Sequence, residues 1–230
     1  QIFNIASIYK GVVNSDSFSV HDFDILTLYP LDFEEFLWAN AEFALTREIR
    51  NHFSDFSPMG KKLHEKALSQ FRLYLIIGGM PAAIMEYKKE KKLLLDLTPS
   101  KSSLHLYPVD TGLCSCILKI PAFQLLSGEE TTAGTACIET FLAQHFIRNG
   151  YALSYWSSGN QAEVPFLLSK NSHFIAIDYR TAPHQKCRNL MQLNKSSLSP
   201  APTQMYLISA EDFRQKEAYR IVPLYAVFCI

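Results

Sequence analysis

The chain has 230 residues, of which 48% are hydrophobic, and its formal net charge is zero. This length predicts one large domain or two small ones, with enough apolar side chains for a core. A zero net charge argues against a strong general affinity for nucleic acid, although residues 151–230 carry 8 basic against 5 acidic side chains.

The cysteine pattern and the hydropathy indicate in which cellular compartment the protein is expected. The five cysteines are Cys114, Cys116, Cys137, Cys187 and Cys229, and they form no CxxC pair. An odd number without zinc spacing predicts reduced, mostly buried thiols and a cytoplasmic location. No apolar stretch approaches the roughly 20 residues that a membrane span needs, and no signal peptide is evident, so we expect no membrane contact.

The N-terminal third predicts strands followed by a helix. Alternating residues over 1–13 and 22–30 favour two short strands. The stretch LDFEEFLWANAEFALTREIRNHF, residues 31–53, then predicts one helix. Asp32 is the expected N-cap, and Glu35 stands three residues later, at the spacing of a capping box.

Two further helices and a linker are expected next. The apolar pattern predicts a helix over residues 61–77 that ends at Gly78-Gly79, where a glycine can leave the helical conformation. Pro81 suits the first turn of a following helix, which finishes in lysines. Residues 96–105 have the composition of a linker, and a strand or turn leading into a short helix should follow.

The residue pattern of the C-terminal half predicts a helix and several strands. Residues 135–149 predict an amphipathic helix, in which His145 is expected to be packed rather than catalytic. We expect strands over 151–158, 161–168 and 174–180 in a meander, then a polar linker over 183–202, then strands over 203–210 and 221–230.

The second and third strands of this meander suggest a site. A tight turn near Asn171 places Pro165 opposite Asp178 and Glu163 opposite Arg180. Gln161, Glu163, Asp178 and Arg180 are then expected to share one face. Converging carboxylates suit a hard cation such as Mg²⁺, and a neighbouring base can stabilise anionic charge.

The structural alternative is an ordinary hairpin with a Glu163–Arg180 ion pair on a solvated face, worth only a few tenths of a kcal/mol. In either case Pro165 lacks a backbone donor. It therefore predicts an edge position or a local bulge in its strand.

Several stretches resemble the C-terminal part of bacterial and archaeal AAA-type ATPases that carry a restriction-endonuclease-like, PD-(D/E)XK-like domain of unknown function. The most specific are YPLDFEEFLWA, IIGGMP and SGNQAEV; LYPVDTGL and PLYAVFCI also match. The resemblance spans most of the chain. It implies an ATPase half followed by a nuclease-like half.

The sequence departs from that family in three ways. It contains no GxxxxGK[ST] phosphate-binding loop, and the region before LYPVDTGL is shortened. The family pattern AEVDF followed by an EVK-like triplet reads AEVPF and Asp178-Tyr179-Arg180 here. The metal-binding aspartate is thus replaced by Pro165 and the lysine by Arg180, whereas Glu139 matches the acidic helix residue of the family.

The resemblance implies an α/β fold in two parts. Residues 1–90 would be the truncated end of an ATPase domain with its helices, residues 91–105 a linker, and residues 106–230 a nuclease-like α/β/α core with a mixed sheet. Without the strands that it should pack against, the first part would expose apolar faces around Phe33, Phe36, Trp38 and Leu75. We therefore expect self-association or a protein partner there.

The leading functional hypothesis is a remnant of an AAA-type ATP-binding protein whose degenerate nuclease-like module binds protein or nucleic acid without catalysis. The alternative is an active metal-dependent nuclease that uses Glu139, Glu163 and Asp178, with Mg²⁺ as its ion. In the degenerate site these carboxylates hold metal weakly or not at all, because Arg180 pairs bidentately with Glu163 or Asp178. ATP is expected only in full-length members of the family.

Overall fold

The computed structural model describes residues 29–90, 107–128, 131–158, 162–171, 173–180, 187–196, 198 and 200–230. Several predictions concern parts of the chain outside these residues: the strand over 1–13, most of the strand over 22–30, the linker over 91–105 and Gln161.

The N-terminal part of the described chain is helical. Its helices are α1 (Phe33–Ala39), α2 (Phe43–Asp55), α3 (Lys61–Ile77), α4 (Pro81–Glu90), α5 (Thr111–Ile117) and α6 (Ala122–Ser127). The predicted bounds of α3 are confirmed, as are the start of α4 at Pro81 and a short helix after residue 107. None of the helices in the described ranges is long and apolar enough to cross a membrane.

The C-terminal part forms one mixed sheet with helices. The elements are α7 (Thr132–Arg148), β1 (Ala152–Ser157), β2 (Glu163–Lys170), β3 (His173–Arg180), α8 (Arg188–Lys195), β4 (Gln204–Ser209), β5 (Arg214–Gln215), β6 (Arg220–Pro223) and the 3₁₀ helix η2 (Leu224–Cys229). The strand order is β1-β2-β3-β4-β6-β5, so the predicted mixed α/β fold is confirmed.

The sheet combines two kinds of pairing. The meander β1-β2-β3 is antiparallel, as predicted, whereas β4 pairs parallel to β3 and β6 parallel to β4. Parallel neighbours need a crossover connection, which is usually a helix. The segment 183–202, predicted as a polar linker, therefore contains α8, which buries Leu190 and Leu193 against the sheet.

Two other predictions of local structure are wrong. The single helix expected over 31–53 is interrupted between α1 and α2, where Ala41 has a positive φ of 61° and the side chain of Asn40 donates to the Phe36 carbonyl. The strand expected over 221–230 ends at Pro223, and the chain continues as η2. The capping box of Asp32 and Glu35 is confirmed.

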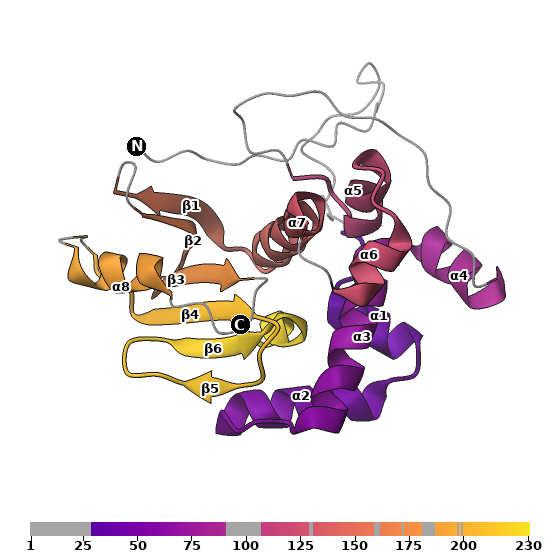
Figure 1. The fold of residues 1–230 in the computed structure, drawn as a ribbon, viewed down its shortest axis with the longest axis horizontal. Coiled ribbons are helices and arrows are strands. Elements are labelled where there is room, and N and C mark those ends of the chain that lie inside the picture. The colour runs from indigo at the N-terminus through magenta and orange to yellow at the C-terminus, as the bar shows by residue number, and fades with distance from the viewer. Residues whose placement is uncertain are drawn as a thin grey trace, which may run out of the picture.

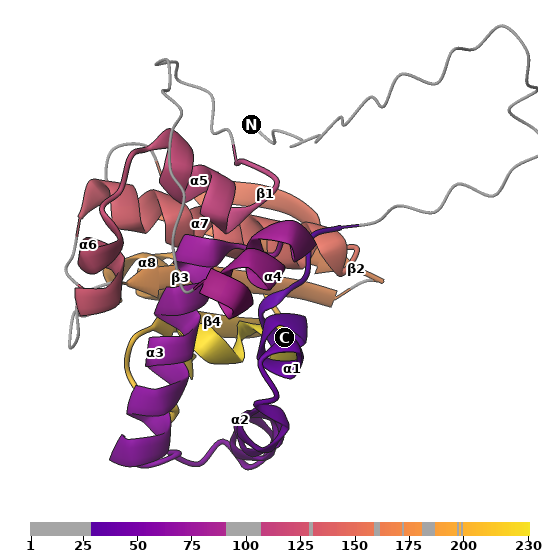
Figure 2. The same ribbon diagram turned by 90° about the vertical axis from the view of Figure 1, so that its right-hand side faces the viewer.

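Figure 1 shows the sheet on one side of the molecule and α1 to α6 gathered on the other, with α7 between them. Seen from the helical side in Figure 2, α1, α3 and α4 lie in front of the sheet. One apolar cluster joins these helices to α7, η2 and the near face of the sheet, and a second cluster lies under α8 on the far face.

The N-terminal helices bury the apolar face that was expected to be exposed. Phe33 and Phe36 are fully buried and Leu75 is 3% exposed. The ring of Phe33 lies 5.5 Å from that of Phe71 and 6.2 Å from that of Phe228 in η2. The expected exposure is thus wrong except at Trp38, which is 44% exposed. The division of the chain into parts over 1–90 and 106–230 stays a prediction. Self-association of the first part also stays a prediction.

The IIGGMP and LYPVDTGL stretches meet at a joint between α3 and α5. The buried carboxylate of Asp110 accepts hydrogen bonds from the backbone N–H groups of Gly79 at 2.5 Å and Leu113 at 2.9 Å. A Cβ on Gly78 would lie 2.1 Å from this carboxylate, and a Cβ on Gly79 would lie 2.0 Å from the Leu31 carbonyl oxygen. Gly78 therefore allows the backbone to approach Asp110 closely, and Gly79 allows it to approach Leu31 closely.

Candidate functional site

The pairing between β2 and β3 stops at a proline. The register follows the predicted turn at Asn171, and the last pair before the strands separate is Phe166 with Ile177. On the other side of β2, the register with β1 shifts between Ser154 and Trp156, where β2 carries one extra residue. The bulge predicted for Pro165 is confirmed, whereas the edge position is wrong because β2 lies between β1 and β3.

A cavity of about 310 Å³ opens where β2 and β3 separate. Its lining residues are Thr135, Glu139, Glu163, Pro165, Asp178, Tyr179, Arg180 and Asn189. Side chains from α7, β2, β3 and α8 therefore meet at this junction. The structure brings together the four residues that the sequence singled out as a site, Glu139, Glu163, Asp178 and Arg180.

On the α8 side of the sheet, Asp178 is saturated with hydrogen-bond donors. Its Oδ1 accepts from the Tyr179 backbone N–H at 2.9 Å and from Arg180 Nη1 at 2.8 Å. Its Oδ2 contacts Arg180 Nη2 at 2.8 Å and accepts from the thiol of Cys187 at 3.3 Å. The predicted bidentate pairing of Arg180 is confirmed, with Asp178 as the partner.

Burial disfavours the ionised form of the Asp178 carboxyl group, whereas the neighbouring hydrogen-bond donors favour it. Asp178 is 1% exposed, and desolvation raises its pKa, although the Arg180 guanidinium and the other donors lower the pKa in part. The same burial, together with the nearby Asp178 carboxylate, raises the pKa of the Cys187 thiol to about 12. Cys187 therefore stays a neutral donor to Asp178 at ordinary pH.

On the α7 side, Glu139 accepts a very short hydrogen bond from the hydroxyl of Tyr179. Burial and this bond raise the pKa of that hydroxyl, so it remains a donor. Val164 packs under α8, and alternation along β2 therefore directs the exposed Glu163 toward the α7 side. Burial, together with the nearby carboxylates of Glu139 and Glu163, raises the pKa of Tyr107 to about 12.

The predicted shared face is thus wrong, because the bulge changes which way β2 side chains point. Asp178 and Arg180 lie toward α8, whereas Glu163 lies toward α7 with Glu139. Among the described residues, no three His, Cys, Asp or Glu side chains converge closely enough to hold a metal ion. Glu139 and Glu163 remain the carboxylates with acceptor capacity for a cation, since an ionised carboxylate has about four acceptor sites.

Sequence reasoning missed four residues of this site. Tyr179 and Cys187 complete the hydrogen bonds of the acids, and Thr135 and Asn189 line the cavity. Thr135 stands one helical turn before Glu139, a spacing that could have indicated it. Cys187 and Asn189 gave no signal, because the segment around them did not read as a helix.

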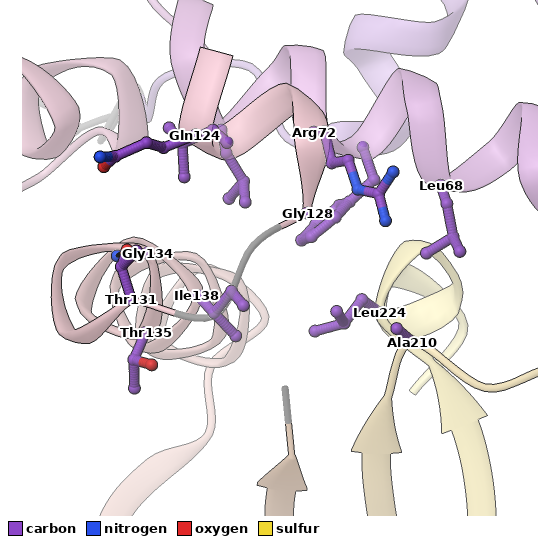
Figure 3. Close-up of a pocket in the computed structure, with 13 residues that line it drawn as sticks. Leu68, Arg72, Gln124, Gly128, Thr131, Gly134, Thr135, Ile138, Ala210 and Leu224 are labelled. Carbon is purple, nitrogen blue, oxygen red and sulfur yellow. Dashed lines mark hydrogen bonds between the residues drawn. The ribbon is translucent and has the colours of Figure 1, made fainter. Parts of the chain in front are cut away.

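A second pocket, of about 60 Å³, lies between α3, α6, α7 and η2 (Figure 3). Its walls are mostly apolar, and the Arg72 guanidinium lies beside Gly128 at its rim. Ligand pockets for small molecules usually span roughly 300–1,000 Å³. The space is therefore too small for a nucleotide or an organic cofactor, and we do not count it as a functional site.

Comparison with known proteins gives one match. The model of a family described as Domain of unknown function (DUF4143) matches residues 135–227. This range begins in α7 and ends in η2, so it contains the sheet, α8 and the cavity. No curated protein and no solved structure matches the chain.

Proposed function

We propose that this chain is related to the AAA-type ATPases that it resembles, and that its nuclease-like module binds a partner without cleaving it. The observation that carries the proposal is the bidentate pairing of Arg180 with Asp178, which occupies both oxygens of the acid. A hard cation prefers such oxygens free and convergent. The match over residues 135–227 supports the family half of the proposal.

The nucleotide part of the proposal rests on the sequence. A phosphate-binding loop cradles the β- and γ-phosphates with backbone N–H groups and a lysine. No GxxxxGK[ST] occurs in these 230 residues. We therefore expect no binding of Mg-ATP in a calorimetric titration, and saturable micromolar binding would contradict this part.

The non-catalytic part of the proposal is tested by rebuilding the metal site. Pro165→Asp restores the carboxylate that the family pattern carries, and Arg180→Lys replaces the planar fork with a compact charge that grips Asp178 less firmly. We expect weak or no Mn²⁺ binding by the wild type and clear binding by the double variant, measured by paramagnetic relaxation of water. Each single variant serves as a control and should bind less than the double one.

The second candidate is an active metal-dependent nuclease that uses Glu139, Glu163 and Asp178. What favours it is that all three carboxylates line the same cavity. Incubation of plasmid and single-stranded DNA with Mg²⁺ or Mn²⁺ separates the two candidates. Cleavage by the wild type that is lost in Asp178→Asn and Glu163→Gln would overturn the binding proposal, whereas no cleavage supports it.

A further inference from the structure

The cavity at the end of β2 and β3 has an unbalanced charge. Its walls carry three carboxylates and one guanidinium, a formal net charge of −2. The guanidinium of Arg180 is held against Asp178 and cancels that acid. The charge that an occupant would meet is therefore that of Glu139 and Glu163, both on the α7 side.

We infer that this cavity receives a cationic side chain, a lysine or an arginine, presented by a partner protein. The inference rests on the proposed binding function and names its ligand. A phosphate group would stand beside Glu139 and Glu163, for which the described residues of the cavity wall supply no cation other than Arg180, and like charges at close range are unfavourable. An ammonium or guanidinium group would instead form charge-assisted hydrogen bonds with both of them.

The size of the cavity also favours a single side chain. Its volume of about 310 Å³ is at the lower end of the roughly 300–1,000 Å³ that is usual for ligand pockets. The cavity therefore has room for one lysine or arginine side chain. A lysine or arginine has a long apolar stem with a charged end, so its charge can reach the acids in the cavity wall while the stem packs against the surface.

The polar groups around the two acids fit this ligand. One oxygen of Glu139 accepts the Tyr179 hydroxyl, which fixes the carboxylate in place and leaves acceptor capacity for another donor. Glu163 is exposed, so it can meet the incoming group first. Thr135 and Asn189 supply further polar atoms to the same walls.

The test compares probes of opposite charge. N-acetyl-arginine methylamide and N-acetyl-lysine methylamide serve as cationic probes, a 20-nucleotide single-stranded DNA as the anionic probe, and Mn²⁺ as the metal. Binding is followed by amide chemical shifts of the full chain at low salt. Glu163→Gln removes one charge from an exposed position, and Glu65→Gln, on the exposed face of α3, is the matched control.

We expect the cationic probes to shift resonances of residues around the cavity, and Glu163→Gln to weaken their binding about three- to fivefold, as for a partly exposed ion pair. The same variant should strengthen any binding of DNA, and Glu65→Gln should change neither. Three outcomes would each overturn the inference. The first is DNA binding at the cavity that Glu163→Gln weakens, and the second is no binding of the cationic probes. The third is binding of Mn²⁺ that is tighter than the binding of the cationic probes. DNA binding would leave the proposed binding function intact, whereas DNA cleavage would remove it.

Discussion

Asp110, at the joint between α3 and α5, and Asp178, at the end of β3, are 2% and 1% exposed. Burial raises the pKa of both carboxyl groups above its usual value. Asp110 is held by backbone N–H groups of Gly79 and Leu113, whereas Asp178 is held by the guanidinium of Arg180 and by a thiol from α8.

The two hydrogen-bonding arrangements restrict the amino-acid sequence to different degrees. Backbone donors reach Asp110 only if the chain approaches closely, which requires glycine at position 78. A side-chain donor such as Arg180 reaches Asp178 from two residues away and can be replaced without moving the backbone. We therefore expect a substitution in the joint to lower the free energy of unfolding more than a substitution in the site.

The largest expected effect tests the joint. Gly78→Ala would place a Cβ 2.1 Å from the Asp110 carboxylate, at a φ of 77°. Backbone strain and the forced loss of the Asp110 hydrogen bonds should together lower the free energy of unfolding by about 4 kcal/mol or more. Urea unfolding followed by circular dichroism measures this change.

Gly60→Ala is the control for Gly78→Ala. Gly60 has the same φ of 77°, but a Cβ there would meet no atom within 4 Å. This variant should lose about 2 kcal/mol from strain alone. Equal losses for the two variants would mean that the contact with Asp110 contributes nothing.

The second prediction concerns the charged partner of Asp178, which Asp110 does not share. Arg180→Gln leaves the buried Asp178 without a cation, and it should lower the free energy of unfolding by about 3 kcal/mol at pH 7.5. The folded pKa of Asp178 is already raised, and this variant raises it further. Stability from such a group is present at low pH and is lost as the pH rises through the folded pKa, so the loss should shrink at pH 5.

Urea unfolding at the two pH values tests this prediction. Arg188→Gln, at an exposed position of α8, is the matched control and should change stability little at either pH. A loss in Arg180→Gln that is the same at pH 5 and pH 7.5 would show that the charge of Asp178 is not its cause.

The smallest expected effect comes from a buried base. Burial of His145 in α7 lowers its pKa from 6.5 to about 4. Its contribution to stability is therefore present above pH 6.5 and is lost as the pH falls toward 4, by about 2 kcal/mol between pH 7.5 and pH 5. The raised pKa values of Asp110 and Asp178 act in the opposite direction over the acidic range.

The contribution of His145 is isolated by difference. The stability of the wild type minus that of His145→Gln should fall by about 2 kcal/mol from pH 7.5 to pH 5 in urea unfolding. Asn149→Ala, which removes the amide that contacts the ring but keeps the imidazole, should retain most of this pH dependence. A difference that does not vary with pH would mean that the ring is charged, or freely hydrated, in the folded protein.

Local signals in the sequence predicted most of the elements and part of the site. The capping box at Asp32, the bounds of α3 and the meander of β1 to β3 follow from side-chain spacing and turn residues. α8 was missed because its sequence is polar apart from the few apolar residues that it buries, and it forms as the crossover between parallel strands. η2 was predicted as strand because an apolar run fits either structure.

For the site, the sequence by itself determined that the end of β2 carrying Glu163 and Pro165 lies near the end of β3 carrying Asp178 and Arg180, because the turn at Asn171 fixes the register. It also determined that Pro165 interrupts the pairing, since proline has no backbone donor. Only the tertiary structure decided which face each acid takes. The bulge at Pro165 turns Glu163 toward α7, and packing of α7 against the sheet brings Glu139 to Tyr179, which is 40 residues away in sequence. Side-chain direction after a bulge and contacts between distant elements depend on packing of the whole chain, which no local pattern encodes.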